Sequence, residues 1–251
     1  MTTNVATENE VFEFANGVMI YRRDLMSEQL ERYATQEAPI HEPVEEAWFE
    51  RILASAGSRG CFVDIGAALG YYCVLCYRRR PGFRIVAVDP SPDFRARFHE
   101  TLALNAVPPD KIELVDEAVY SGASEVRFAR RSFGSHVLDR PSASRPDDIT
   151  VPAVTLEALL ARIGGTVTLA KLDIQGAELA VLRSSRAVLS AGSVEYWIIG
   201  THGPRIHAEV VGLLGECHEI LFEEQAPEDQ PDGIVVARWR GLASDVGDVA
   251  R

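Results

Sequence analysis

The sequence has no excess of positive charge. Of its 251 residues, 25 are lysine or arginine and 37 are aspartate or glutamate, so the formal net charge is −12. Proteins that bind nucleic acid or an anionic membrane usually present a basic surface to the phosphates. We therefore expect neither partner for this chain.

Long apolar runs are absent as well. No stretch approaches the ~20 apolar residues that a membrane span requires. The first residues include Glu8, Glu10 and Glu13 and do not have the pattern of a signal peptide. We expect a protein that stays in the cytoplasm.

Cysteine is scarce, with four residues in the whole chain. Cys73 and Cys76 form a C-x-x-C pair, but no second pair follows, so a zinc site is not expected. The pair falls on a predicted helix face rather than at a helix N-terminus, which distinguishes it from a redox pair. We expect buried, reduced thiols, as in a reducing compartment.

The stretch 61–72, CFVDIGAALGYY, has the pattern of a buried strand, a turn and a helix. Its first five residues are apolar except for Asp64, which is typical of a buried parallel strand. Apolar residues then recur at helical spacing, which predicts a helix over 68–80. Gly66 and Gly70 lie in the turn, where glycine permits positive φ and the close approach of a ligand. An acid at a strand end followed by this turn predicts a pocket for a nucleoside cofactor.

The turn does not have the dinucleotide pattern G-x-G-x-x-G, because Ala68 occupies the place of the second glycine. An acid before the glycines would repel a pyrophosphate, whereas Asp64 can pair with the ammonium of a methionine-like ligand. The string resembles motif I of S-adenosylmethionine-dependent methyltransferases. This resemblance implies cofactor contacts from Asp64, Gly66, Ala67, Gly70 and Tyr72.

A second apolar strand, 84–88, also ends in an acid, Asp89. At this place in a βαβ unit a carboxylate accepts hydrogen bonds from both ribose hydroxyls. The alternative, that Asp89 only caps the following helix, is less favoured beside the glycine turn. Asp116 and Glu117 follow the third strand and are candidates for the adenine amine, and the sequence leaves open which of them binds it.

Strands and helices alternate along the chain, which predicts a doubly wound, mainly parallel α/β sheet of seven strands, Rossmann-like, with one antiparallel strand near the C-terminus. We expect an N-terminal extension over residues 1–59, a main domain over 60–240 and a tail over 241–251. The extension should hold a hairpin around Asn16-Gly17 and two helices. A polar loop over 132–148 is the segment expected to be most mobile. Strands are expected at 61–65, 84–88, 111–115, 151–154, 166–173, 194–199, 217–222 and 233–238, and helices at 25–33, 44–56, 68–80, 91–106, 155–163, 176–189 and 205–214, with a further hairpin near 121–128.

The most specific string is 168–178, TLAKLDIQGAE. Together with 61–72 and the Glu42-Pro43 pair, it resembles the FkbM-type family of S-adenosylmethionine-dependent methyltransferases, over about residues 40–238. The resemblance implies O-methylation of a hydroxyl on a sugar or secondary metabolite, with S-adenosylmethionine as cofactor and a small molecule as acceptor. Two positions depart from the family pattern: Ala68 replaces an Asn, and Gln175 replaces a Glu. Because Gln175 carries no charge, we predict no metal.

Three side chains are candidates for catalysis. Asp173 ends the fourth main strand and is expected near the transferred methyl group, because ligands bind at the carboxyl ends of such strands. His202 follows the fifth strand and His136 lies in the polar loop, and either can serve as the general base. For both histidines the alternative is a solvated or capping side chain. Lys171 and Glu178 flank the motif and are candidates for an ion pair.

Other interpretations stay open. Five arginines around the polar loop suggest either a solvated loop or recognition of an acidic acceptor. A nucleotide-dependent oxidoreductase and a non-catalytic binding protein are the rival functions, and a protein acceptor is not excluded. The oligomeric state is also open, a homodimer included. The arginines are Arg127, Arg130, Arg131, Arg140 and Arg145.

Overall fold

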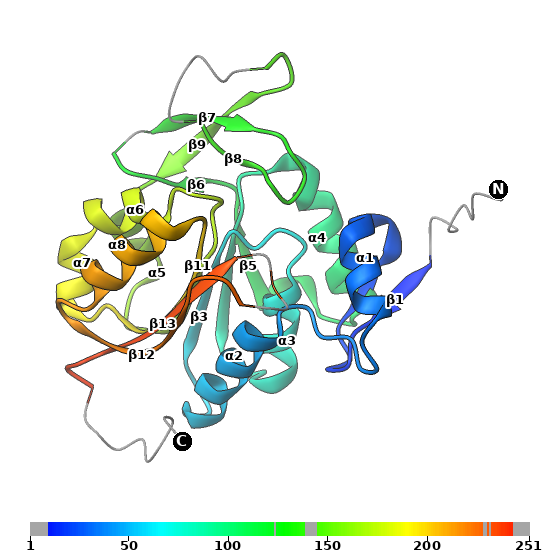
Figure 1. Ribbon diagram of the computed structural model, residues 1–251, viewed down its shortest axis with the longest axis horizontal. Helices are drawn as coiled ribbons and strands as arrows, with labels where there is room; N and C mark the ends of the chain where they lie inside the picture. The colour runs from blue at the N-terminus through cyan, green and yellow to red at the C-terminus, as the bar shows by residue number, and fades with distance from the viewer. Residues whose placement is uncertain (1–9, 123, 139–144, 228–229, 231, 243–251) are drawn as a thin grey trace.

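A sheet of seven strands forms the centre of the molecule, which we describe from a computed structural model (Figure 1). The structure describes residues 10–122, 124–138, 145–227, 230 and 232–242. The strand order is β12-β13-β11-β10-β3-β4-β5. The strands are β3 (Cys61–Ile65), β4 (Arg84–Val88), β5 (Ile112–Val115), β10 (Val167–Leu172), β11 (Val194–Thr201), β12 (His218–Glu224) and β13 (Gly233–Trp239).

Strand β13 is antiparallel to both of its neighbours, β11 and β12, and the pairs from β11 to β5 are parallel. The predicted seven-stranded sheet with one antiparallel strand is therefore confirmed. From β3 the order runs outward to β4 and β5 on one side, and from β10 to β11 on the other. The switch point between β3 and β10 is where an open α/β sheet binds its ligands.

Helices cover both faces of the sheet (Figure 1). Successive residues of a strand point to opposite faces, so Phe62 of β3 packs in one apolar cluster with Phe49 and Phe98, and Val63 packs in the other with Leu182. All five residues of β3 are buried. One face carries α2 (Pro43–Ser55), α3 (Tyr71–Arg79) and α4 (Pro92–Leu104), and the other carries α5 (Leu156–Ile163), α6 (Glu178–Ser184), α7 (Arg186–Ala191) and α8 (Pro204–Leu214).

Two predicted helices differ from those observed. The helix expected over 68–80 begins only at Tyr71, because Ala68 and Gly70 have positive φ and cannot belong to a right-handed helix. The helix expected over 176–189 is divided into α6 and α7 at Ser185, which lies outside helical geometry with φ −111° and ψ 30°.

The N-terminal segment packs on the same apolar cluster as the sheet. Its hairpin pairs β1 (Val11–Glu13) with β2 (Met19–Tyr21) around Asn16 and Gly17, which confirms the predicted turn. A 3₁₀ turn, Arg22–Asp24, leads to α1 (Ser27–Ala34). Phe14 and Tyr33 are buried in one cluster with Phe98 of α4, so the segment is continuous with the core.

A smaller sheet of four strands lies beyond the end of β5, at the top of Figure 1. The predicted hairpin near 121–128 contributes only one strand, Glu125–Ala129, to this small sheet. In the main sheet, the 3₁₀ turn Pro109–Lys111 precedes β5. Residues 139–144 of the loop expected to be mobile lie outside the described residues. The strands, in the order β6-β9-β7-β8, are β6 (Ala118–Val119), β9 (Ile149–Val154), β7 (Glu125–Ala129) and β8 (His136–Val137).

All four cysteines are free thiols in described segments. Cys61, Cys73 and Cys76 are buried, and Cys217 is partly exposed. In the part of the chain that the structure describes, no helix has both the length and the apolar character that crossing a membrane requires.

Candidate functional site

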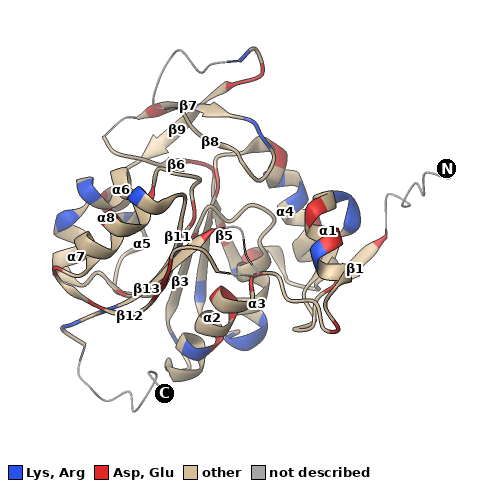
Figure 2. Ribbon diagram, viewed as in Figure 1, with Lys and Arg blue, Asp and Glu red and all other residues tan. Residues whose placement is uncertain are grey.

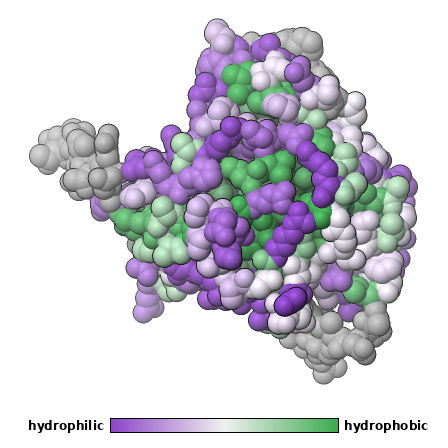
Figure 3. Space-filling view, turned by 180° about the vertical axis from the view of Figure 1, so that it is seen from behind, coloured by the Kyte–Doolittle hydropathy of each residue, from purple (hydrophilic) through white to green (hydrophobic). Residues whose placement is uncertain are grey.

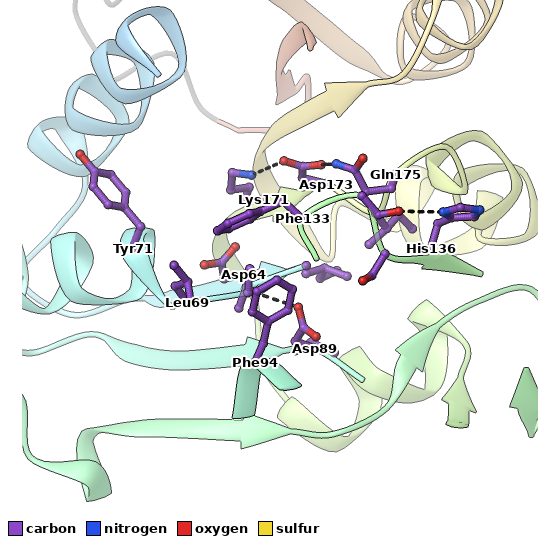
Figure 4. A pocket seen from close by; sticks show the side chains of 18 of the residues that line it. Asp64, Leu69, Tyr71, Asp89, Phe94, Phe133, His136, Lys171, Asp173 and Gln175 are labelled. Atoms are coloured by element: carbon purple, nitrogen blue, oxygen red, sulfur yellow. Dashed lines mark hydrogen bonds and ion pairs between the residues drawn. The ribbon is translucent and has the colours of Figure 1, made fainter. Parts of the chain in front are cut away.

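A cavity of about 370 Å³ opens at the carboxyl ends of β3, β4 and β10. Its walls come from the N-terminal segment, the turn between β3 and α3, the segments after β4 and β5, and the small sheet with the loop before β8. The end of β10 with the residues after it and the turn before β13 complete the wall. In Figure 4, Lys171 and Asp173 lie together at one end of the cavity, and Asp89 and Phe94 lie together at the other. Of the residues predicted for the site, the cavity wall includes Asp64, Gly66, Ala67, Tyr72, Asp89, Glu117, His136 and Asp173.

The two glycines of the β3–α3 turn are required by neighbouring protein atoms. Gly66 has φ +92°, and a Cβ there would lie 1.9 Å from the carbonyl oxygen of Asp173. Gly70 has φ +81°, and a Cβ there would lie 2.6 Å from the Phe98 ring. We expected these glycines to admit a ligand, and Gly66 lines the cavity. The structure adds a second requirement, the close approach between β3 and β10 and between the turn and α4.

Asp89 holds this turn in place from the end of β4. One carboxylate oxygen accepts the N–H of Ala68 at 2.9 Å, and the other accepts the N–H of Ser91 at 2.8 Å. Burial raises the pKa of Asp89 to about 6, although both hydrogen bonds favour the ionised form. A carboxylate has about four lone-pair sites, so each oxygen can accept a further hydrogen bond from the cavity.

Asp64 is buried, and its Oδ1 atom has no hydrogen-bond partner among the described residues. Its other oxygen accepts a weak hydrogen bond from the Cys73 thiol at 3.4 Å. Burial raises the pKa of Asp64 to about 6, against the opposing charge of Lys171. A buried oxygen without a partner is costly, and here it lies on a cavity wall where a ligand can donate to it.

Lys171 is the centre of a buried charge cluster. Its Nζ lies 3.0 Å from Asp173 Oδ2 and 3.3 Å from Glu45 Oε1, and 5.2 Å from the centre of the Tyr72 ring. The Lys171–Glu178 pair that we considered from the sequence is therefore replaced by pairs with Asp173 and Glu45. Burial raises the pKa of Glu45 to about 8, so Asp173 carries the charge that balances the lysine at neutral pH. Burial alone would raise the pKa of Asp173, but Lys171 and His202 hold it below the usual range.

Tyr72, the last cofactor contact that the motif I resemblance implies, donates its hydroxyl hydrogen to Glu42 at 3.1 Å. It lines the cavity, with Lys171 over its ring. Its hydrogen bond to Glu42 connects α3 with the N-terminal segment.

His202 is enclosed by three carboxylates. Its Nδ1 atom lies 3.0 Å from Glu178 Oε1, and its Nε2 atom lies 3.2 Å from Asp232 Oδ1 and 3.7 Å from Asp173 Oδ1. Burial lowers the pKa of the imidazole, but the hydrogen bond to Glu178 and the three negative charges outweigh it and raise the pKa to about 9. In this state the ring is protonated at neutral pH and has no lone pair with which to act as a base.

His136 makes a different set of contacts. It lies on the cavity wall in β8, and its Nδ1 contacts the carbonyl oxygen of Gly134 at 2.8 Å. A carbonyl oxygen can only accept, so Nδ1 carries the hydrogen. In the neutral ring Nε2 then has the lone pair that a general base needs.

The structure separates the two candidates for adenine. Asp116 is exposed and pairs with Arg95 at 2.7 Å, and it is not part of the cavity wall. Glu117 lines the cavity and pairs with Arg162 at 2.6 Å. Only Glu117 is therefore placed to contact a ligand.

Two of the arginines around the small sheet pair with acids. Arg130 pairs with Asp93, and Arg131 pairs with Asp148 at 2.8 Å. No arginine lies among the described residues that form the cavity wall, and Arg140 lies outside the described residues.

Several wall residues were not found by sequence reasoning. Ile20, Leu25, Met26 and Gln29 come from the N-terminal segment, and Asp232 comes from the turn before β13. Glu42 lines the cavity too, and the Glu42-Pro43 pair was the part of this segment that entered the family resemblance. His41, which the sequence did not single out, contacts the Tyr33 hydroxyl at 2.7 Å and also lines the cavity. Burial and the charge of Lys171 lower its pKa to about 3, so it is neutral.

Comparison with known proteins gives a consistent result. Residues 64–229 match the family model described as the methyltransferase FkbM domain. The match begins at Asp64 and spans the sheet from the end of β3 to the turn before β13. No curated protein matches the sequence.

Solved structures share the fold at low sequence identity. One is an S-adenosylmethionine-dependent methyltransferase from Agrobacterium tumefaciens, with a TM-score of 0.51 and 11% identity, covering 94% of this chain and 71% of that one. Another is an rRNA methylase from Streptococcus thermophilus, with a TM-score of 0.50 and 11% identity, covering 80% of this chain and 99% of that one. At these identities the similarity is one of fold, the Rossmann-like fold of methyltransferases.

Proposed function

The chain belongs to the FkbM methyltransferase family, and on this premise we propose that it methylates a hydroxyl group of a small molecule. Its cofactor is S-adenosylmethionine, which when bound supplies an electrophilic methyl group on a sulfonium. We further propose the class of acceptor and the roles of individual residues.

The cavity residues fit this cofactor. Asp64 offers a buried oxygen without a partner in the described part of the chain, suited to the ammonium of the methionine moiety. Asp89 keeps accepting capacity on both oxygens, suited to the two ribose hydroxyls. Glu117 is the acid placed to accept from the adenine amine.

The remaining wall supports a small, largely apolar acceptor. Ile20, Leu25 and Phe133 present apolar side chains to the cavity, and Met26 is an exposed methionine at its edge. Figure 3 shows a hydrophobic hollow near the centre of the face opposite to that of Figure 1, ringed by hydrophilic residues. Apolar walls with a few polar groups are typical of small-molecule sites.

We assign the acceptor's proton to Nε2 of His136, the cavity-lining histidine whose tautomer leaves that atom free to accept. A general base in this position contributes about 10²–10⁴-fold in rate. The cavity walls hold the acceptor in line, and good orientation is worth roughly 7–11 kcal/mol.

A polyanionic acceptor is less favoured. Lys171 is the one lysine or arginine among the described wall residues, and its charge is already balanced by Asp173. Figure 2 shows acidic and basic residues interspersed on the outer helices α1 and α4, where an RNA-binding protein would be expected to have a basic face. The chain as a whole has a net charge of −12, which argues against RNA, the substrate named for the streptococcal structure.

The test has two steps. Calorimetry should show micromolar binding of S-adenosylhomocysteine, the product of the reaction, no binding of NAD, and loss of the signal in Asp89→Ala. Methyl-labelled cofactor is then incubated with the enzyme and with separate small-molecule, RNA and protein fractions of a cell extract. We expect base-stable label, as in a methyl ether, in the small-molecule fraction. Label found only in RNA or protein would refute the proposal.

A further inference from the structure

We infer that Asp173, Asp232 and His202 form a site for one divalent metal ion at the Lys171 end of the cavity. The inference rests on the proposed function, because the ion would bind an oxygen of the acceptor. The three residues come from separate segments: the end of β10, the segment after β11 and the turn before β13. Asp173 and Asp232 line the cavity.

The distances suit ligands of a common ion. His202 Nε2 lies 3.2 Å from Asp232 Oδ1 and 3.7 Å from Asp173 Oδ1. Two ligand atoms that are each about 2.1 Å from one cation lie roughly 3.0–3.4 Å apart in octahedral or tetrahedral geometry. Small side-chain movements are therefore enough to close the site. Asp173, Glu178 and His202 also have potential ligand atoms that all lie within 4.8 Å of one another.

The unsatisfied hydrogen-bonding capacity of one ring nitrogen is an independent observation. His202 Nε2 is buried and has no hydrogen-bond partner among the described residues, although Asp232 is only 3.2 Å away. The carboxylate oxygen lies off the direction in which the nitrogen would donate. A cation on that axis would displace the proton that the carboxylates hold on this nitrogen, bind the nitrogen and reach the neighbouring oxygen from the side.

Glu178 orients the imidazole. It is fully buried, and its oxygens accept the N–H groups of Ile174 at 2.9 Å and Gly176 at 3.1 Å. Glu178 Oε1, which accepts these N–H groups, also lies 3.0 Å from His202 Nδ1. This contact turns His202 Nε2 toward the two aspartates. A carboxylate bound to the second ring nitrogen is the usual arrangement around a metal-ligating histidine.

Asp173 has one oxygen for each neighbour. Its Oδ2 binds Lys171 at 3.0 Å, while Oδ1 faces His202 and receives only a long hydrogen bond of 3.3 Å from the Gln175 amide. Amide nitrogen and oxygen are interchangeable by rotation, so Gln175 can present its oxygen to the same ion. We predicted no metal because Gln175 is uncharged, but the ligands proposed here come from other positions.

The ligand set indicates the kind of ion. Two carboxylates and one imidazole suit Mn²⁺ and related divalent ions, and Mg²⁺ to the extent that oxygen ligands dominate. Three protein ligands leave open positions on a six-coordinate ion, and the cavity lies on that side. The acceptor class is then a molecule whose hydroxyl has a second oxygen nearby, which can occupy two of those positions.

The experiment measures Mn²⁺ binding directly, from the spin-resonance signal of the free ion, in ligand-free full-length protein. Wild type should bind one Mn²⁺ per chain, and Asp232→Asn and His202→Gln should each weaken binding at least tenfold. The matched control is Glu223→Gln, which changes the His207–Glu223 pair, with Nε2 and Oε2 2.7 Å apart, outside the cavity wall. The control should bind Mn²⁺ as wild type does, and circular dichroism should show all variants folded.

Calorimetry with S-adenosylhomocysteine on the same samples separates the two proposals. If wild type binds S-adenosylhomocysteine but not Mn²⁺, or if both variants keep full Mn²⁺ affinity, the metal site is refuted and the proposed function stands. His202 would then serve as a structural imidazolium among the carboxylates. If Mn²⁺ binds as expected but S-adenosylhomocysteine does not, the metal site is supported and the proposed function is not.

Discussion

At the scale of single residues, the proposed role of Asp89 in binding the ribose would link cofactor binding to pH, because this carboxyl group is buried. Its pKa is raised from 3.8 to about 6 by burial, against the hydrogen bonds from Ser91 and Ala68. Between about pH 4 and pH 6 the Asp89 carboxyl group keeps its proton in the folded protein, whereas in the unfolded chain it has already released it. The ligand-free protein therefore loses stability from this group as the pH rises through about 6, and the same rise creates the carboxylate that a ribose needs.

We predict that adenosine binds about tenfold more tightly at pH 7 than at pH 5. Adenosine has the ribose but no ammonium, so it reports on Asp89 and not on Asp64. Calorimetry at a series of pH values measures the effect, and Asp89→Asn should bind weakly with little pH dependence. The exposed Asp116→Asn should behave as wild type, and an unchanged pH profile in Asp89→Asn would contradict the assignment.

His136 and His202 differ in their contacts: Nε2 of His136 can accept a proton from a ligand, whereas both ring nitrogens of His202 face carboxylates. For His136 we predict that replacement by Ala lowers kcat by about 10²–10⁴-fold with unchanged affinity for S-adenosylhomocysteine. The exposed His99→Ala is the control and should keep full activity. Wild-type turnover in His136→Ala would remove this residue from the mechanism.

At the scale of elements, the turn between β3 and α3 depends on one close contact. The backbone of Gly66 touches the carbonyl group of Asp173, so the site is built where two neighbouring strands end side by side. A side chain at Gly66 would push β3 and β10 apart at the point where Asp64 and Asp173 are held.

Gly66→Ala should therefore lower the free energy of unfolding by about 3 kcal/mol or more, from the clash together with the positive φ. Gly122 is the matched control: it has φ +85°, but no described heavy atom within 4 Å of a Cβ placed there. Gly122→Ala should cost only about 1–2 kcal/mol. Urea denaturation measures both, and equal losses would show that the contact does not matter.

The strands could be predicted from the sequence because their apolar runs are short and end in acids. Asp64, Asp89 and Asp173 fell at the cavity for that reason. The predicted start of α3 was wrong because an alanine in the sequence gives no indication that its φ will be positive, as it is at Ala68. The division between α6 and α7 at Ser185 was not visible either, since the apolar spacing continues across it.

The site was less predictable where it depends on contacts between distant segments. Glu45 meets Lys171 only because α2 crosses the end of β10, and Asp232 reaches His202 from a turn without any motif. Neither pairing leaves a local pattern. The protonation of His202 depends on the same contacts, so it could not be predicted without knowing that three carboxylates surround the ring.

At the scale of the whole molecule, the N-terminal segment and the sheet share one apolar cluster. Phe14, Tyr33 and Phe49 are almost fully buried together with Phe62 and Phe98. A wall of the cavity is therefore part of the main core, and it cannot open without exposing that core.

We predict that the two parts unfold in one transition. A variant with Trp197→Phe and Trp239→Phe leaves Trp48 of α2 as the only tryptophan. Its fluorescence should change at the same denaturant concentration as the circular dichroism of the whole chain. An earlier midpoint for Trp48 would show that the N-terminal segment unfolds separately.

The placement of the thiols has a practical consequence. Cys61, Cys73 and Cys76 are buried, whereas Cys217 is partly exposed between α8 and β12, at the edge of the sheet away from the cavity. A maleimide dye added to the native enzyme should therefore attach at a single point without any engineered cysteine. That dye would report on the tumbling of the molecule and on its self-association while leaving the cavity unobstructed.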